Sequence, residues 1–333
     1  MKKLWAILVH LSHNMWPKHY DDLYEGFDED TWSCILEECH AAGLNAILLD
    51  VGDGVEFDSH PEIRVKNAWS KERVHQEVAR CRELGITLIP KLNFSTSHHQ
   101  WLGDYTHMVS SQVYYRVAKD LITEVYEMFE KPPYIHLGMD EEDARHSNQN
   151  GYHVFRSGEA LWHDMRYLMD CVTQLGATPW IWMDFLFAYP EAFKEHIGTD
   201  RAVISPWYYK ALFPEHFTPL EDRPDYAAFF GKPEWANKNI RFCEDAPDAV
   251  QWRADAEKLK TENYRYAPCA SVYDHLYYNT EDMVRFYRDG CTDEQMIGYV
   301  TAPWYCTVPD ELERFTTSIR LLKEARQLLY PEV

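Results

Sequence analysis

One unit recurs along this 333-residue chain: a helical stretch ends at a glycine, and a short apolar run follows directly. Residues 31–42 carry apolar side chains at helical spacing and stop before Gly43, and the apolar run 45–50 comes next. The same unit recurs at Gly85 and Gly176. Glycine readily adopts the left-handed conformation that ends a helix, and so short and continuous an apolar run is typical of a strand buried on both faces. The alternation predicts a parallel sheet covered by helices.

Eight strands of this kind can be counted, and helical patterns fill the intervals between them. Eight strand–helix units predict an α/β fold, a (β/α)8 TIM barrel. We expect a single catalytic domain over residues 1–333, with a long insertion after the sixth strand at 211–246, a stretch rich in Pro, Phe, Asp and Glu. The predicted strands are Leu4–Ser12, Asn45–Asp53, Thr87–Phe94, Tyr134–Glu142, Thr178–Phe185, Arg201–Tyr209, Tyr266–Asp274 and Ile297–Tyr305.

The charge balance restricts the partners of this chain. Its 33 Lys and Arg against 54 Asp and Glu give a formal net charge of −21. An acidic chain repels phosphate backbones and anionic lipid, so we expect neither nucleic acid nor a membrane as a partner. Neither G-x-G-x-x-G nor a P-loop motif is present, which argues against a nucleotide cofactor. The 12 Trp and 22 Tyr suit a pocket that stacks on sugar rings, and a small glycan is the expected partner.

The N-terminus resembles a signal peptide only superficially. Two lysines precede an apolar run, but no small-residue cleavage site follows, and we interpret residues 4–12 as the first strand. A cytoplasmic protein is the default expectation, although a chain trimmed of its leader would look the same. The eight cysteines show no zinc-binding spacing, and we interpret most of them as buried thiols.

Polar and aromatic residues gather where the predicted strands end, whereas the strand beginnings are plain. In a (β/α)8 barrel the carboxyl ends of the strands surround the active site, so this asymmetry predicts a catalytic mouth. The residues at these ends are His10 and His13, Asp50 and Asp53, Asn93, Asp140, Glu141 and Glu142, Asp184, Trp207, Tyr273 and Asp274, and Trp304.

The sharpest signal is the segment 134–142, in which a buried run leads through Gly138 into three carboxylates. Adjacent carboxylates repel one another and burial raises the pKa of at least one of them, so one can serve as a general acid near neutral pH. The alternative is an acidic cluster that favours the N-terminus of the following helix.

Aromatic residues and histidines near the strand ends each have two interpretations. Trp182, Trp207, Tyr273 and Trp304 could enclose a sugar ring, or they could be core residues. The histidines could hold a metal, but the H-x-x-H spacing on the first strand does not point two ligands the same way. We therefore expect no metal, and keep a metal-dependent hydrolase using His10, His98 and Asp140 as an alternative.

Residues 136–141, His-Leu-Gly-Met-Asp-Glu, resemble the His-x-Gly-Gly-Asp-Glu signature of family 20 β-N-acetylhexosaminidases. The run 89–93 followed by His98 is similar to the family's Ile-Pro-Glu-Ile-Asp segment and its later His. Trp182 and Asp184 resemble its Trp–acid pair after strand five. The aromatic residues after strands six and seven and on strand eight also fit the family's order; they are Trp207, Tyr273 and Trp304.

The resemblance implies a glycoside hydrolase that removes a terminal N-acetylhexosamine with retention, assisted by the substrate itself and without a cofactor. Glu141 would protonate the glycosidic oxygen and then activate water. Asp140 would orient the 2-acetamido group, whose oxygen attacks the anomeric carbon. Tyr273 would hydrogen-bond the acetamido oxygen. The other substrate-binding residues would be His10, Asn93, His98, Trp182, Asp184, Trp207, Asp274 and Trp304.

Four departures from the family's pattern concern hydroxyl recognition more than acid chemistry. Cys306 stands where the last strand of the family carries a Glu, and residues 13–16 replace an Arg that grips the far hydroxyls. Asn93 replaces an Asp, and Met139 replaces the second Gly of the signature. The identity of the sugar is therefore the open point. A barrel that binds carbohydrate without turnover is a further alternative.

Overall fold

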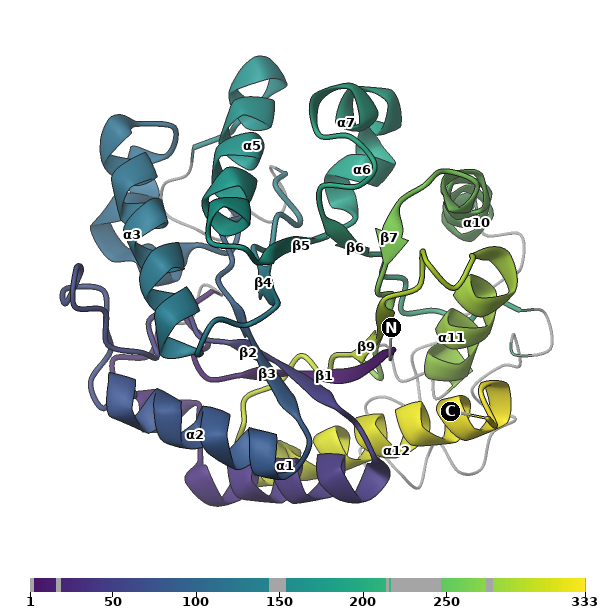
Figure 1. The fold of residues 1–333 in the computed structure, drawn as a ribbon, viewed down its shortest axis with the longest axis horizontal. Coiled ribbons are helices and arrows are strands. Elements are labelled where there is room, and N and C mark those ends of the chain that lie inside the picture. Colours follow the sequence, from purple (N-terminus) through teal and green to yellow (C-terminus); the bar gives the residue numbers. More distant parts are fainter. Residues whose placement is uncertain are drawn as a thin grey trace.

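The computed structural model describes residues 3–15, 19–143, 154–213, 216, 247–273 and 278–332. Their strands form one parallel sheet in the order β7-β6-β5-β4-β3-β2-β1-β9-β8, which curls into a barrel with the helices outside it (Figure 1). The strands are β1 (Leu4–His10), β2 (Ala46–Asp50), β3 (Thr87–Lys91), β4 (Tyr134–His136), β5 (Thr178–Trp182), β6 (Val203–Ser205), β7 (Arg265–Tyr266), β8 (Cys269–Ala270) and β9 (Gly298–Thr301).

The barrel closes through one predicted strand that the structure divides into two. β7 pairs with β6 and β8 pairs with β9, and only Ala267 and Pro268 lie between β7 and β8. The Ala267 N–H donates to the carbonyl of Ile204 at 2.9 Å, and the Val300 N–H donates to the carbonyl of Pro268 at 2.8 Å. The segment thus bridges the last gap in the sheet, and the predicted (β/α)8 barrel is confirmed.

Helices separate the strands and cover the outer face of the sheet (Figure 1). Gly43, Gly85 and Gly176 have φ of 72°, 74° and 93°, the left-handed conformation predicted at the helix ends. None of the helices in the described ranges is both long and apolar enough to cross a membrane. The α-helices are α1 (Glu29–Ala42), α2 (Lys71–Glu83), α3 (Gln112–Met128), α5 (Gly158–Gln174), α6 (Asp184–Ala188), α7 (Pro190–His196), α10 (Pro247–Lys260), α11 (Tyr278–Gly290) and α12 (Leu312–Leu329), and the 3-10 helices are η1 (Leu23–Glu25), η2 (Gln100–Met108) and η5 (Pro309–Glu311).

Each strand is buried on both faces because successive side chains point to opposite sides. On β1, Ala6 and Leu8 belong to the apolar cluster inside the barrel, whereas Trp5, Ile7 and Val9 belong to the larger cluster beneath the helices. The interior cluster also includes Trp180 and Trp182 from β5. This double burial accounts for the continuous apolar runs in the sequence.

The strands are shorter than predicted, and at β4 the backbone turns away before the acid pair. β4 ends at His136, and Gly138, Met139 and Glu141 then have φ of 75°, 68° and 52°, values that no strand can contain. The catalytic candidates therefore lie on loops above the sheet. Of the predicted insertion, residues 214–215 and 217–246 lie outside the described residues, so its role and the extent of the domain stay predictions.

Candidate active site

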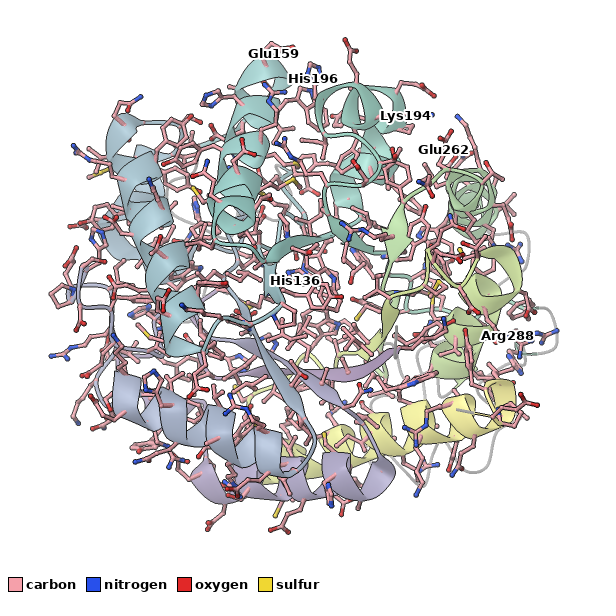
Figure 2. The ribbon with its side chains drawn as sticks, in the orientation of Figure 1. His136, Glu159, Lys194, His196, Glu262 and Arg288 are labelled. Carbon is pink, nitrogen blue, oxygen red and sulfur yellow. The ribbon has the colours of Figure 1, made fainter. Side chains whose placement is uncertain are left out.

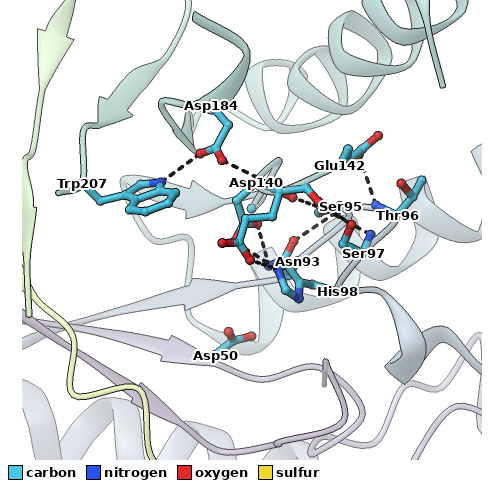
Figure 3. Close-up of polar contacts among 12 residues, drawn as sticks. Asp50, Asn93, Ser95, Thr96, Ser97, His98, Asp140, Glu142, Asp184 and Trp207 are labelled. Carbon is cyan, nitrogen blue, oxygen red and sulfur yellow. Dashed lines mark hydrogen bonds and ion pairs between the residues drawn. The ribbon is translucent and has the colours of Figure 1, made fainter. Parts of the chain in front are cut away.

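The predicted acid pair lies at the carboxyl end of β4, on the loop that leaves the barrel (Figure 3). The Asp140 side chain is 14% exposed and that of Glu141 is 27% exposed. Both side chains are thus mostly covered, and that of Glu141 is the more exposed of the two. Met139 and Glu141 have left-handed φ, which costs a non-glycine residue about 1–2 kcal/mol, so neighbouring groups must hold this loop in place.

Two side chains from the end of β3 contact the acid pair. Asn93 Nδ2 donates to Asp140 Oδ1 at 3.0 Å. His98 Nε2 lies 3.1 Å from Glu141 Oε2 and 3.6 Å from Asp140 Oδ2. The structure therefore brings four predicted site residues into contact, of which Asn93, His98 and Asp140 are labelled in Figure 3.

The backbone of the acid pair is held by two hydroxyl groups. Ser95 Oγ donates to the carbonyl of Asp140, and Ser97 Oγ donates to the carbonyl of Glu141 (Figure 3). Sequence analysis missed both serines, although the polar run between Phe94 and His98 was a signal for them. These contacts join the loop after β3 to the loop after β4.

Asp184, the first residue of α6, connects the acid pair to the aromatic residues. Its Oδ1 accepts from the Glu141 backbone N–H at 3.0 Å, and its Oδ2 accepts from Trp207 Nε1 at 2.9 Å (Figure 3). Asp184 was predicted to pair with Trp182, but its carboxylate binds the indole N–H of Trp207 and the backbone of Glu141 instead.

The carboxyl groups of this cluster retain protons more readily than isolated ones. Burial, together with the charge of Asp140, raises the pKa of Asp184 to about 7. Burial also raises the pKa of Asp140, helped by the charge of Glu141 and opposed by His98 and Lys91. Burial lowers the pKa of His98, but the attraction of Asp140 and Glu141 outweighs it and the net shift is upward. Asp184, Asp140 and His98, the titratable groups around Glu141, therefore each bind a proton more readily than the isolated side chains do.

A buried ion pair lies below the acid pair, inside the barrel. Lys91 on β3 and Asp50 on β2 are register partners, their Nζ and Oδ2 atoms form an ion pair, and both side chains are 1% exposed. His10 Nδ1 lies 3.5 Å from Asp50 Oδ2. Although burial raises the pKa of Asp50, Lys91 and His10 lower it further, so Asp50 is ionised.

The predicted metal set of His10, His98 and Asp140 does not form one cluster. His10 lies beside Asp50, whereas His98 and Asp140 meet Glu141 instead. The ligand atoms of His98, Asp140 and Glu141 lie within 4.8 Å of one another, which suits a single divalent cation with N and O ligands. These three residues are the metal-competent cluster found in the described part of the chain.

Aromatic rings line up from the barrel interior to its mouth. The ring centroids of Trp182 and Trp304 are 5.6 Å apart, and those of Trp304 and Tyr209 are 6.2 Å apart. Tyr209 stacks on Trp207 at 5.3 Å. Trp182 is buried in the interior, while Trp207 and Trp304 are partly exposed. The three predicted indoles therefore form one series that ends next to Asp184.

The two tyrosines at the mouth differ in their surroundings. Tyr273 is 49% exposed and its ring lies 6.4 Å from that of Tyr305. Tyr209, which sequence analysis missed, has its pKa raised by burial and by the charges of Cys269, Glu141 and Asp140. The charges of Glu141 and Asp140 thus add to the effect of burial on the pKa of Tyr209. Asp274 lies outside the described residues, so its predicted role stays a prediction.

Two departures from the family pattern meet at one part of the rim. Tyr20 Oη lies 3.8 Å from Cys306 Sγ, and the ring centroids of Tyr20 and His13 are 6.4 Å apart. His13, Asn14 and Tyr20 line a small hollow beside this contact. His13, Tyr20 and Cys306 do not supply the Arg and the Glu that the resemblance implies for hydroxyl binding. A carboxylate is nevertheless present here, because Asp22 lines the same hollow.

His136 fixes the start of the acid-bearing loop from inside the barrel (Figure 2). Its Nδ1 accepts from the Gly138 N–H at 3.0 Å. Burial and the charge of Lys91 lower its pKa well below the usual range, so the ring is neutral. Gly138 is needed here, because a Cβ would lie 1.9 Å from Asn93 Oδ1.

We expect Gly138→Ala to displace Asn93 and break its hydrogen bond to Asp140. Gly85→Ala is a matched control, because Gly85 has φ of 74° against 75° at Gly138 but has nothing within 4 Å of an added Cβ. Gly85→Ala should lower the free energy of unfolding by about 1–2 kcal/mol through its backbone alone. Gly138→Ala should lower it further, as urea unfolding will measure. Equal losses in the two variants would contradict this account.

The fold and the site together define a (β/α)8 barrel with an acid pair after its fourth strand and aromatic rings at its mouth. Solved structures that resemble it include family 20 β-N-acetylhexosaminidases and dispersin B. The enzyme from Bacteroides fragilis superposes with a TM-score of 0.60 at 13% identity, over 96% of this chain and 65% of that one. The Streptomyces plicatus enzyme gives 0.59 at 12% identity, over 96% and 62%. Dispersin B gives 0.60 at 13% identity, over 97% and 98%.

These similarities are similarities of fold, and the predicted resemblance to family 20 is confirmed at that level. The chain spans about half to two thirds of several of these enzymes, for example 54% of the Vibrio harveyi β-N-acetylglucosaminidase. No protein-family model matches the sequence. No curated protein is significantly similar to it either.

Proposed function

We propose that this protein is a glycoside hydrolase that removes a terminal N-acetylhexosamine from a small glycan. The observation that carries the proposal is the contact among His98, Asp140 and Glu141, with Glu141 partly open to ligand. The fold shared with family 20 hexosaminidases supports it. Ligands in that family's structures include N-acetylglucosamine, bound by the Vibrio harveyi enzyme.

In the proposed reaction Glu141 donates a proton to the glycosidic oxygen. The acetamido oxygen of the sugar attacks the anomeric carbon and the leaving group departs with that proton. Glu141, now a carboxylate, removes a proton from water, which opens the cyclic intermediate and restores the acid. His98 at 3.1 Å steadies the carboxyl group of Glu141 through both steps.

Asp140 would hold the acetamido group and balance the positive charge that develops on it. Asn93 orients the Asp140 carboxylate through its 3.0 Å hydrogen bond. Trp207 and Trp304 would pack against the sugar ring, with Trp182 below them. Tyr273 stays the predicted donor to the acetamido oxygen. Tyr209 is a second candidate, because it stacks on Trp207 and the charges of Glu141 and Asp140 help to raise its pKa.

A panel of aryl glycosides tests the proposal. The β-glycosides of N-acetylglucosamine and N-acetylgalactosamine should be hydrolysed, while those of glucose and galactose, which lack the attacking acetamido oxygen, should not. Comparing the two acetamido sugars tests whether the rim of His13, Tyr20 and Cys306 has changed hydroxyl recognition. Cleavage of the plain hexosides would contradict substrate assistance and require a protein nucleophile.

The cluster of His98, Asp140 and Glu141 supports a second candidate function, a metal-dependent hydrolase. In that case purified protein should contain stoichiometric zinc or manganese, and a chelator should abolish activity. Full activity in the presence of the chelator would exclude this candidate. Binding of amino sugars without hydrolysis of any glycoside would instead indicate a carbohydrate-binding barrel.

A further inference from the structure

The third carboxylate of the acidic segment is not part of the open site. The Glu142 side chain is 2% exposed and forms an ion pair with Arg156, which is 1% exposed. Arg156 Nε donates to Glu142 Oε2 at 3.1 Å, and the Thr96 N–H donates to Glu142 Oε1 at 3.1 Å. The Glu142 carboxylate therefore lies inside the protein and anchors the loop that carries Asp140 and Glu141.

Arg156 contacts three separate parts of the chain at once. Besides Glu142, its Nη2 donates to the carbonyl of Phe94 at 3.0 Å and lies 3.7 Å from Met139 Sδ. Its Nη1 lies 3.5 Å from Asp164 Oδ2 on α5. The guanidinium group thus ties the loop after β3, the loop after β4 and α5 together, a set of contacts that suits its planar fork of donors.

Asp164 is itself fixed, so the contact with Arg156 is rigid. Its side chain is fully buried. Ser110 Oγ donates to Asp164 Oδ2 at 2.6 Å, and the hydroxyl of Tyr115 on α3 donates to Oδ1. The buried cluster of Glu142, Arg156 and Asp164 consequently rests on two outer helices.

The loop needs such an anchor because its backbone is strained. Met139 and Glu141 have φ of 68° and 52°. Arg156 contacts Met139 and also Glu142, the residue that follows Glu141. Left-handed non-glycine residues persist only where the surroundings hold them. Without the anchor, the loop can relax and carry the Glu141 carboxyl away from His98.

We propose that Arg156, through its ion pair with Glu142, is the positioning residue that holds the general acid Glu141 in its reactive geometry. The inference rests on the proposed function for its catalytic consequence. Its structural part, that Arg156 holds the backbone of residues 137–143 in one conformation, does not depend on any substrate.

The test compares Arg156→Met with Arg73→Met. Arg73 is a matched control because it also pairs with a buried carboxylate, Glu77, which is 3% exposed, but on the outer helix α2 at 2.9 Å. We expect Arg156→Met to lower kcat by about tenfold with KM within about twofold, since misplacing a catalytic group slows chemistry more than binding. Arg156→Lys, which keeps the charge but not the fork, should be intermediate. Arg73→Met should keep wild-type kcat.

Hydrogen exchange measures directly how well the backbone amides of the loop are protected. Arg156→Met should speed amide exchange in residues 137–143 and leave β2 unchanged, whereas Arg73→Met should leave 137–143 unchanged. If Arg156→Met does not fold, the same measurement on Arg156→Lys decides. A folded Arg156 variant with wild-type exchange in 137–143 would overturn the proposal, as would wild-type kcat in Arg156→Met. If the wild-type protein hydrolyses no glycoside, the proposed function fails, and the exchange result still decides the anchoring role.

Discussion

Glu141→Gln should lower kcat/KM for an N-acetyl-β-glucosaminide with a poor leaving group by about 10²–10⁴-fold, the usual contribution of a general acid. The amide keeps the size of the side chain and its contact with His98 but has no proton to donate. The carboxyl group it replaces is 27% exposed and 3.1 Å from His98 Nε2. Steady-state kinetics on a series of aryl glycosides will measure the loss.

The leaving group supplies an internal control for this prediction. An aglycone of low pKa departs without protonation, so the loss in Glu141→Gln should shrink as the aglycone becomes more acidic. Glu37→Gln, on the exposed face of α1, should have wild-type activity throughout the series. If Glu141→Gln retains full activity on the poor leaving group, Glu141 is not the acid.

The largest expected effect on stability comes from the ion pair inside the barrel. Lys91→Met should lower the free energy of unfolding by about 3–5 kcal/mol, because it leaves Asp50 charged and buried without its partner. Both side chains are 1% exposed, and burial lowers the pKa of the remaining neighbour, His10, which disfavours its taking over the positive charge of Lys91. Urea unfolding at pH 7 will measure the change.

A double variant and a surface pair make this prediction specific. Lys91→Met combined with Asp50→Leu should recover most of the loss, since no unpaired charge remains. Lys194→Met breaks the exposed pair with Glu262, whose atoms lie 2.6 Å apart at the outer edge of the barrel (Figure 2), and should cost less than about 1 kcal/mol. Equal losses for Lys91→Met and Lys194→Met would contradict the buried-charge argument.

The barrel was predictable because its signals are local. Helix ends at Gly43, Gly85 and Gly176 and continuous apolar runs need no knowledge of distant contacts. The positions of Asp140, Glu141, Asn93, His98 and Asp184 followed from one rule, that the carboxyl ends of parallel strands meet at one edge.

The contacts within the site were not predictable, because they depend on loop conformation. Charge and spacing alone do not distinguish Glu142 from Glu141, and only the resemblance to the family signature singled out Glu141. In the structure Glu142 is 2% exposed and bound to Arg156, whereas Glu141 is 27% exposed and contacts His98. The difference arises from the left-handed φ of Glu141, which turns successive side chains apart. Tyr209 was missed for the same reason, since an aromatic after a strand can pack in the core or face the mouth.

The divided strand at Ala267 and Pro268 makes the barrel mechanically uneven. β1 has five register pairs with β2 and four with β9, whereas two pairs hold β7 to β6 and two hold β8 to β9. Strand pairing is therefore more extensive around β1 than at the point where the barrel closes through β7 and β8. Pairing between β3 and β4 is shorter still, with the single register pair of Lys91 and His136. The hydrogen bonds from Asn93, Ser95 and Ser97 to the loop after β4 therefore also join these two strands above the sheet, where the barrel itself joins them least.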